Sequence, residues 1–382
     1  MFRRILAILL LLSLTAAFCS VSLAEETVKI GKKSLDNMKF AGLLPDGRMV
    51  FGGHMEEGTD SSRKARLLCL NPEGTVSWEY VDQKAGYYYE TVVTAEGTIA
   101  VIQPDAVRLF SADGQFTGNE IPLDNPRGFY LYELTSHGLL TEAKEFTGWD
   151  GNILFELAEP LMYKVHSLTA DEDGLVLTGW ESLSRGMDAQ AKMMKVDWQG
   201  VILWEKTLPV MTEEDSGWLR PSFRTGDGGY LALHEQSVFH PDTEQMSYYA
   251  EVVKFSADGE ILWTKRAADS GENPDMIFTD IAEYNGKYVV LCRKQGQSFY
   301  PGILLYLWLD KDGKELGTIR RSISKEDVPE LAAGRHVNSS LEQLVATKEG
   351  LWQSITFWDE DLNNEKKTYD SMQQVLLPIP AL

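Results

Sequence analysis

The chain has 382 residues and a formal net charge of −21, with 43% hydrophobic and 10% aromatic residues. This apolar content supports a sizeable core and excludes global disorder, and the length allows one large repeat domain or two ordinary domains. The negative charge repels nucleic acid and anionic lipid surfaces, so neither is expected as a partner.

The first 24 residues have the pattern of a secretory signal peptide. Arg3 and Arg4 are followed by an apolar run over 5–18, and small residues at 22 and 24 precede Glu25. This order of basic, apolar and small residues is what signal peptidases recognise. We predict a signal peptide over 1–24 and a single exported domain over 25–382, extracellular or at the cell surface, with no membrane attachment after cleavage.

Two other fates of this segment stay open. Its apolar character persists to Leu23, so the segment could be retained as an anchor. Cys19 could be acylated, although Phe18 stands where a lipobox has a small residue. The remaining cysteines, Cys69 and Cys292, lie in apolar runs of different repeats, and we expect both to be buried free thiols.

A hairpin pattern recurs along the chain. In 250–266, two runs of alternating apolar and polar residues meet at Asp258-Gly259, which predicts two strands joined by a two-residue turn. Similar hairpins occupy 66–80 and 192–207, and weaker copies keep only the glycine. Successive turn glycines lie 37 to 59 residues apart, and they are Gly74, Gly114, Gly151, Gly200, Gly259 and Gly313.

A second pattern, an apolar strand, a glycine-containing turn and another apolar strand, precedes each hairpin. Its copies lie at 40–52, 91–102, 131–140, 168–179, 223–233, 281–292 and 344–355, the third being degenerate. Together the two patterns give seven units of four strands. One such unit cannot bury both of its apolar faces, whereas a ring of units covers every face. We therefore predict an all-β fold, a β-propeller of seven four-stranded blades.

Tryptophans and the chain ends should complete this ring. Trp78, Trp204 and Trp263 are large enough to fill the wedge between neighbouring blades, which widens away from the axis. Blades two, three and six lack this tryptophan, so we expect looser packing at their rims. Closure needs a strand from the opposite end of the chain, which could be 27–30 or 374–379.

The hairpins resemble the repeats of bacterial quinoprotein-type, or PQQ-like, propellers. That unit has an acidic residue, then a glycine, then a tryptophan four residues after the glycine. The matching sets here are Asp197-Gly200-Trp204, Asp258-Gly259-Trp263 and, with an amide for the acid, Asn71-Gly74-Trp78. The resemblance implies a propeller fold and export, and many members of the wider group are noncatalytic binding or assembly proteins. The adjacent cysteine pair that stacks on a quinone is absent from this sequence, so we expect no cofactor.

Few segments suggest reaction chemistry. His234-Glu235 looks like the start of a zinc-protease helix, but Val238 stands where the second histidine is required and the segment is a predicted strand. The acidic segment 359–370 has alternating ligands of calcium-loop type, although two lysines inside it oppose a cation, and the alternative is a hairpin turn of blade seven. Shorter acidic turns at 171–174 and 310–313 are explained by turn geometry. We expect no metal site.

The remaining candidate is the mouth of the central channel, where the first strand of each blade begins. Aromatic, basic and acidic side chains should gather there and could bind a sugar or a peptide terminus. The predicted ligand-binding residues are Tyr88, Glu90, Tyr130, His166, Trp218, Arg220, Phe278 and Asp280. Alternatively, these are packing residues of the inner strands and ordinary surface.

These observations favour an exported, noncatalytic binding or scaffold protein of the cell envelope, a monomer whose partner is a protein or a glycan. One alternative is a glycoside-acting hydrolase that uses channel-mouth carboxylates such as Glu90 and Asp280. A third possibility is a quinone-dependent oxidoreductase.

Overall fold

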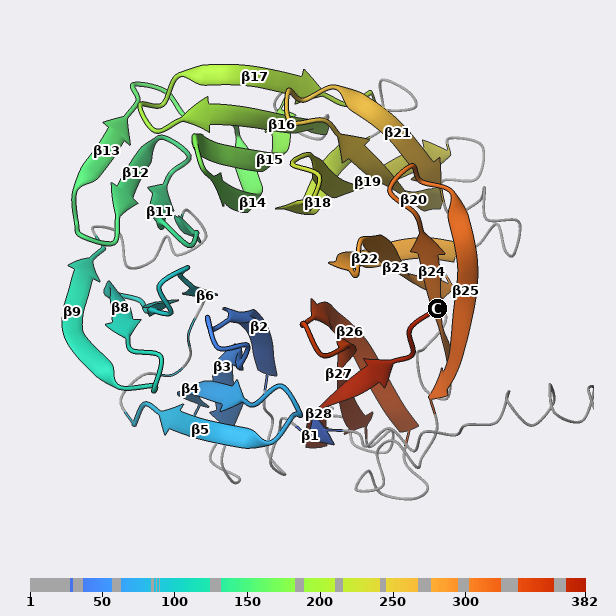
Figure 1. Cartoon of the computed structure of the whole chain (residues 1–382), viewed down its shortest axis with the longest axis horizontal. Coiled ribbons are helices and arrows are strands. Elements are labelled where there is room, and N and C mark those ends of the chain that lie inside the picture. The colour runs from blue at the N-terminus through green and yellow to red at the C-terminus, as the bar shows by residue number, and fades with distance from the viewer. Residues whose placement is uncertain are drawn as a thin grey trace, which may run out of the picture.

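The structure, a computed structural model, describes residues 28–29, 37–56, 63–83, 86, 88, 90–123, 132–182, 189–209, 216–240, 245–266, 276–294, 302–323, 336–360 and 369–382. Within these ranges all regular structure is β-strand, in seven four-stranded antiparallel sheets and without a helix. The sheets follow one another around a ring (Figure 1). The predicted seven-bladed β-propeller is confirmed.

The first four blades each use four consecutive strands. Blade 1 has β2 (Asn37–Leu43), β3 (Met49–Glu56), β4 (Arg63–Leu70) and β5 (Val76–Val81). Blade 2 has β6 (Thr91–Val93), β7 (Ile99–Ile102), β8 (Ala106–Phe110) and β9 (Phe116–Pro122). Blade 3 has β10 (Tyr132–Leu134), β11 (Gly138–Thr141), β12 (Glu145–Gly148) and β13 (Ile153–Glu156). Blade 4 has β14 (Lys164–Asp171), β15 (Gly174–Ser182), β16 (Ala189–Asp197) and β17 (Ile202–Thr207).

The last three blades continue the ring. Blade 5 has β18 (Ser216–Arg224), β19 (Tyr230–His240), β20 (Gln245–Phe255) and β21 (Ile261–Arg266). Blade 6 has β22 (Met276–Tyr284), β23 (Lys287–Lys294), β24 (Gly302–Leu309) and β25 (Glu315–Ile323). Blade 7 has β26 (His336–Ala346), β27 (Leu351–Glu360), β28 (Tyr369–Ile379) and, outermost, β1 (Val28–Lys29).

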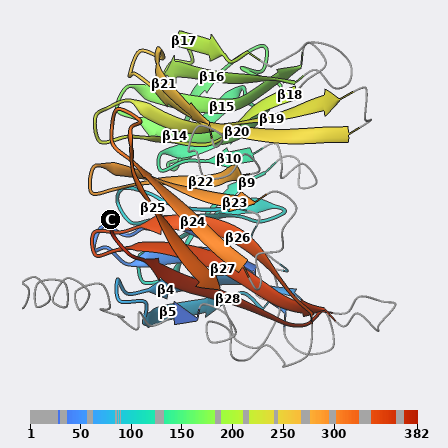
Figure 2. The same cartoon turned by 90° about the vertical axis from the view of Figure 1, so that its right-hand side faces the viewer.

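Blade 7 closes the ring with strands from both ends of the chain. Val28 pairs with Leu376 and Lys29 with Val375, so the two segments proposed for closure are each other's partners. Because strands alternate in direction, the turns after the first and third strands of each blade lie on one face of the ring, seen from the side in Figure 2. The other connections, and the starts of the inner strands, lie on the opposite face.

The hairpin turns differ in one detail from the prediction. The backbone hydrogen bonds Gly259 N–H to Ser256 O and Ser256 N–H to Glu260 O enclose a three-residue loop, not the two-residue turn expected. Only Gly259 has a positive φ, of 80°. This is a type I turn closed by one left-handed residue, which requires glycine at that single position. Asp258 therefore stays in the ordinary right-handed region.

The predicted tryptophan wedges are present between blades. Trp78, Trp204 and Trp263 donate their indole N–H to a backbone oxygen in the next blade's turn, at 3.0, 3.1 and 3.0 Å. Each ring lies on the turn glycine of that blade. On Gly259, for example, a Cβ atom would approach Trp204 to 2.6 Å. The glycine thus serves both the turn and the tryptophan of the blade before it.

The blades without tryptophan behave in two ways. Next to blade 2, no described atom lies within 4 Å of a Cβ position on the turn glycine Gly151, so the looser rim is confirmed for the described part of the chain. Next to blade 3, the ring of Phe155 lies 3.0 Å from that position on Gly200 and takes the tryptophan's place. In blade 6, Leu382 lies 3.2 Å from the position of a Cβ atom on Gly317, so Leu382 fills this rim. The expected looseness of blades three and six is therefore wrong.

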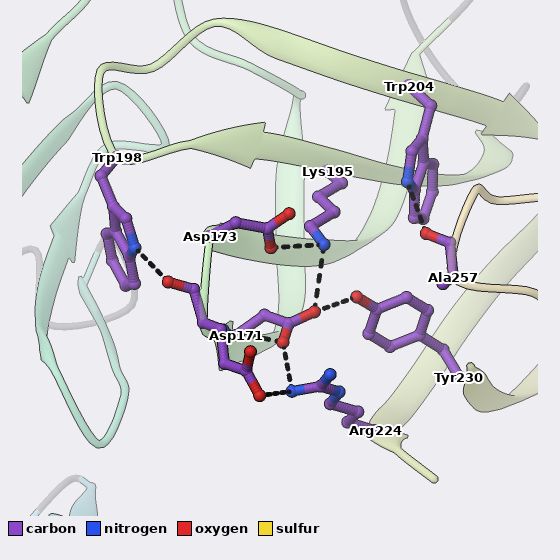
Figure 3. A network of polar contacts seen from close by, with 9 residues as sticks. Asp171, Asp173, Lys195, Trp198, Trp204, Arg224, Tyr230 and Ala257 are labelled. Carbon is purple, nitrogen blue, oxygen red and sulfur yellow. Dashed lines mark hydrogen bonds and ion pairs between the residues drawn. The ribbon is translucent and has the colours of Figure 1, made fainter. Parts of the chain in front are cut away.

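A buried ionic network holds blades 4 and 5 together on the face with the hairpin turns (Figure 3). Asp171 is 5% exposed and accepts from Lys195 at 3.1 Å, from Arg224 at 2.5 Å and from the Tyr230 hydroxyl. Lys195 also pairs with Asp173 at 2.6 Å. The acidic turn at 171–174 therefore does more than satisfy turn geometry, because it neutralises a lysine that is 6% exposed.

Cys69 and Cys292 are buried and free, as predicted. Residues 1–24, where we predict a signal peptide, lie outside the described residues. Within the part of the chain that the structure describes, no helix is long and apolar enough to cross a membrane.

Candidate functional site

The residues predicted for the channel mouth do not form a single group. Tyr88 and Phe278 are 5% and 2% exposed and belong to hydrophobic cores between blades, Tyr88 with Val93 and Phe278 with Leu233. For these two residues the packing alternative is the one that the structure supports. Tyr130 lies outside the described residues.

Asp280 and His166 bind the backbone of a neighbouring blade. Asp280 is 9% exposed and accepts a hydrogen bond of 2.5 Å from the Leu344 amide of blade 7. Burial raises the pKa of Asp280 to about 6, and the amides of Leu344 and Ile281 only partly offset this. Nδ1 of His166 lies 3.2 Å from the Leu219 oxygen of blade 5, and burial lowers the pKa of this half-buried imidazole. Both side chains connect neighbouring inner strands.

Arg220 is the one basic residue of the prediction that is exposed. It lies in β18 and pairs with Glu235 of β19, Nε to Oε2 at 3.1 Å. Trp218 stands opposite Glu235 in the same ladder. These residues belong to blade 5, whereas the carboxylate Glu90 precedes β6 in blade 2.

Glu90 forms part of a half-buried carboxylate pair on the face where the inner strands begin. It accepts from the Leu134 amide of blade 3 at 3.3 Å, and its electrostatic neighbours are Glu133, Lys39 and Lys164. Burial raises the pKa of Glu90, and the charge of Glu133 raises it further. Burial likewise raises the pKa of Glu133, against the attraction of Lys164. These two carboxyls therefore take up protons more readily than free glutamate.

A cleft of about 470 Å³ opens beside this pair, between blades 3 and 4 on the face where the inner strands begin. Its walls come from the start of β10, the β11–β12 turn, the β13–β14 connection and the edges of β14 and β15. The lining residues are Glu133, Glu142, Ala143, Glu159, Pro160, Met162, Tyr163, Lys164, Val165 and Glu181. Glu133 and Lys164 line the cleft and are both electrostatic neighbours of Glu90.

The β11–β12 turn is a strained wall of the cleft. Glu142 and Ala143 have φ values of 48° and 55°, and the Lys144 amide donates to the Thr141 oxygen at 3.0 Å. Two consecutive left-handed residues define a hairpin turn that normally contains Asn-Gly. The turn presents Glu142 at the cleft, where its carboxylate pairs with Lys144 at 3.1 Å.

The β13–β14 connection forms the facing wall. The Leu161 amide donates to the Ala143 oxygen at 2.8 Å, and Leu161 and Met162 are 8% and 2% exposed in the core between the blades. Tyr163 follows them but is 67% exposed. Its ring packs against Trp180 with centroids 4.6 Å apart. The buried neighbours therefore fix an aromatic ring whose surface is open to solvent.

Among the predicted site residues whose side chains are described, Glu90 is the one linked to this group, through its interaction with Glu133 and Lys164. The register from the turn glycines located the inner strands, but it did not identify the cleft, because most lining residues belong to connections. One signal was present in the sequence. Glu133 lies in the degenerate third unit and Glu142 follows it, in a blade whose strands have three or four residues each.

Other predicted motifs have structural roles where they are described. His234 is a fully buried residue of strand β19, hydrogen-bonded to Glu251 at 3.0 Å, which agrees with rejecting the protease motif. Asp310 accepts from two amides of its own turn, as turn geometry requires. Segment 359–370 joins β27 to β28, and residues 361–368 lie outside the described ranges. Among the described residues no group of three acidic, histidine or cysteine side chains could hold a metal ion.

Fold and cleft define this chain as a seven-bladed β-propeller with an acidic cleft at its channel mouth. No protein-family model matches the sequence. No curated protein matches it either.

Solved structures that are similar to this chain include three with 10–11% sequence identity. A protein of unknown function from Bacteroides caccae has 11% identity and a TM-score of 0.34, with 85% of this chain and 89% of that chain covered. Drosophila Plexin A, in complex with Semaphorin 1b, has 10% identity and a TM-score of 0.48, with 92% and 88% covered. A eukaryotic initiation factor has 10% identity and a TM-score of 0.39, with 91% and 79% covered.

Proposed function

We propose that this chain is an exported, noncatalytic propeller that binds a protein or a glycan of the cell envelope through the cleft between blades 3 and 4. The observation that carries the proposal is the cleft itself, a cavity of about 470 Å³ with converging polar side chains and an exposed aromatic ring. Binding sites for small ligands and side chains have this size and this mixture of groups. Its position at the channel mouth adds support.

Support for export comes from the first 24 residues, with their basic start, apolar run and small residues before Glu25. The resemblance to PQQ-like repeats is supported by the register of glycine and tryptophan, because each tryptophan packs on the turn glycine of the next blade. N-terminal sequencing of the protein recovered from its host, and its distribution between envelope and medium, test this part. An intact N-terminus in a cytoplasmic fraction would contradict it.

The two carboxylates suggested for the hydrolase alternative, Glu90 and Asp280, belong to different blades. Glu90 precedes β6 of blade 2 and Asp280 lies in β22 of blade 6, and each binds the backbone of the blade that follows its own. The pair that does lie together is Glu90 and Glu133, and raised pKa values are a property of general acids. If this pair is catalytic, glycan substrates should be cleaved, and Glu133→Gln should abolish the cleavage. Binding of glycans without turnover favours the noncatalytic function.

The binding function is tested by a pull-down on envelope fractions together with a glycan array, both with the exported protein. Tyr163→Ala removes the exposed ring of the cleft without touching the core. Tyr249→Ala is the matched control, because Tyr249 is 44% exposed on β20 of blade 5. We expect retention of a partner or glycan by the control but not by the Tyr163 variant. Equal retention by both variants would exclude the cleft as the binding site.

A further inference from the structure

We infer that the cleft between blades 3 and 4 binds an organic cation, an alkylammonium or guanidinium group carried by a basic segment of an envelope protein. This inference rests on the proposed binding function of the same cleft and specifies the chemistry of its ligand.

The charge of the lining is the first reason. Four of the lining residues are glutamates, Glu133, Glu142, Glu159 and Glu181, whereas Lys164 is the one basic side chain among them. Ionised carboxylates only accept hydrogen bonds, so the ligand must supply the donors. An ammonium group offers three N–H donors and a guanidinium group five, whereas a sugar hydroxyl offers one.

The lysines around the cleft offset part of this charge. Lys144 pairs with Glu142 at 3.1 Å on the turn. Lys192 lies 3.8 Å from Glu181 but closer, at 3.1 Å, to Glu205 outside the cleft. The Glu181 oxygen that faces Lys192 is buried and makes no hydrogen bond to any described group. The Glu181 side chain as a whole is 41% exposed, so its carboxylate is accessible to an N–H group of a ligand.

The aromatic wall is the second, independent reason. Tyr163 is exposed, and Trp180 supports its ring at a centroid distance of 4.6 Å and an interplanar angle of 41°. A cation over such a ring is attracted by the negative face of the ring quadrupole. An aromatic face next to several carboxylates is the combination that recognises organic cations rather than bare metal ions. Consistent with this, no metal-type cluster occurs among the described residues.

Apolar lining residues complete the fit. Met162 and Val165 are 2% and 5% exposed, and Pro160 lies beside them. These side chains can contact the methylene stem of a lysine or arginine, which buries its stem while its charged end stays among polar groups. A cleft of about 470 Å³ has room for one such side chain and part of the adjoining backbone.

Binding of a cation at this cleft should be coupled to the release of protons, which can be measured. Glu133 interacts with Glu90 on the β6 side and with Lys164 of β14, Glu90 also interacts with Lys39 of β2, and burial raises the pKa of both carboxyls. A cation beside them favours their ionised forms, so binding should release protons and tighten as the pH rises. A neutral ligand has no such effect.

Calorimetry tests the inference with the exported protein and four probes: a short capped peptide containing lysine, the same peptide with acetylated lysine, spermidine, and a neutral chitin oligosaccharide. We expect the lysine peptide to bind with proton release, and acetylation to weaken binding at least about tenfold, since it removes the charge. Glu133→Gln and Glu142→Gln should each weaken binding several-fold and leave the circular dichroism spectrum unchanged. Glu349→Gln, in an exposed turn on the opposite face, is the matched control and should bind normally.

The possible outcomes separate the two proposals. Equal binding of the lysine and acetyl-lysine peptides, or binding of the oligosaccharide alone, overturns the cationic ligand but keeps the cleft as a binding site. Tighter binding of spermidine than of the peptide overturns a protein as the source of the cation. Loss of partner retention in Tyr163→Ala, with no binding of any probe, likewise overturns this inference alone. Normal partner retention in Tyr163→Ala overturns both proposals.

Discussion

Asp280 was predicted to bind ligand at the channel mouth. Its buried carboxyl should instead lower the stability of the fold at neutral pH, and this loss can be measured. A pKa of about 6, against an ordinary value of 3.8, means that folding favours the protonated carboxyl. Stability from this group is therefore fully present below pH 4 and is lost as the pH rises towards 6. The difference between these two pKa values lowers the free energy of unfolding by about 3 kcal/mol at neutral pH. Asp280→Asn removes the charge and keeps an oxygen that can accept from Leu344.

Urea unfolding between pH 4 and pH 8, followed by tryptophan fluorescence, measures this effect. The free energy of unfolding of Asp280→Asn relative to the unmodified protein should rise by about 3 kcal/mol across this range, most of it between pH 4 and 6. Asp258→Asn controls for the loss of one surface charge, because Asp258 is exposed in the β20–β21 turn. A relative stability that stays constant with pH, or falls, would refute the reasoning and show that the Asp280 carboxylate is well solvated at the channel mouth.

Two further predictions concern the turns. Gly259→Ala should cost several kcal/mol, because it combines a φ of 80° with a Cβ only 2.6 Å from Trp204, whereas Gly151→Ala, with φ 81° and open space, should cost about 1 kcal/mol. Thermal unfolding of the two variants compares them, and equal losses would contradict the wedge role of the tryptophan. Replacing Glu142-Ala143 by Asn-Gly should stabilise the protein by about 1 kcal/mol and weaken cation binding, because Asn and Gly tolerate positive φ but bring no carboxylate. A stability loss in this double variant would show that the turn is not strained.

Much of the fold could be predicted from local signals. The alternation of apolar residues and the recurring glycines were sufficient for seven units of four strands, because one sheet with two apolar faces cannot be stable alone. The wedge role of Trp78, Trp204 and Trp263 followed from their size and position. The finer packing at the blade rims could not be predicted from the sequence. Leu382 fills the rim of blade 6 because closure brings the end of the chain beside Gly317, a contact between residues 65 positions apart.

For the candidate site, too, local sequence signals predicted one part and tertiary contacts decided the rest. Position on an inner strand predicted that Glu90 and Asp280 lie near the channel, but it did not reveal which polar side chains already bind a neighbouring blade. Asp280 bonds to Leu344, 64 residues further along the chain, while Glu90 meets Glu133 across the boundary between blades 2 and 3. Pairings of this kind depend on how far each blade is rotated against the next.

The sequence by itself therefore determined the repeating unit and the number of blades, since both depend on patterns within a few tens of residues. The tertiary structure alone decided which acidic and aromatic groups share one cleft. That cleft combines a turn, a connection and the starts of two blades, and only packing blade against blade brings them within reach of a single ligand.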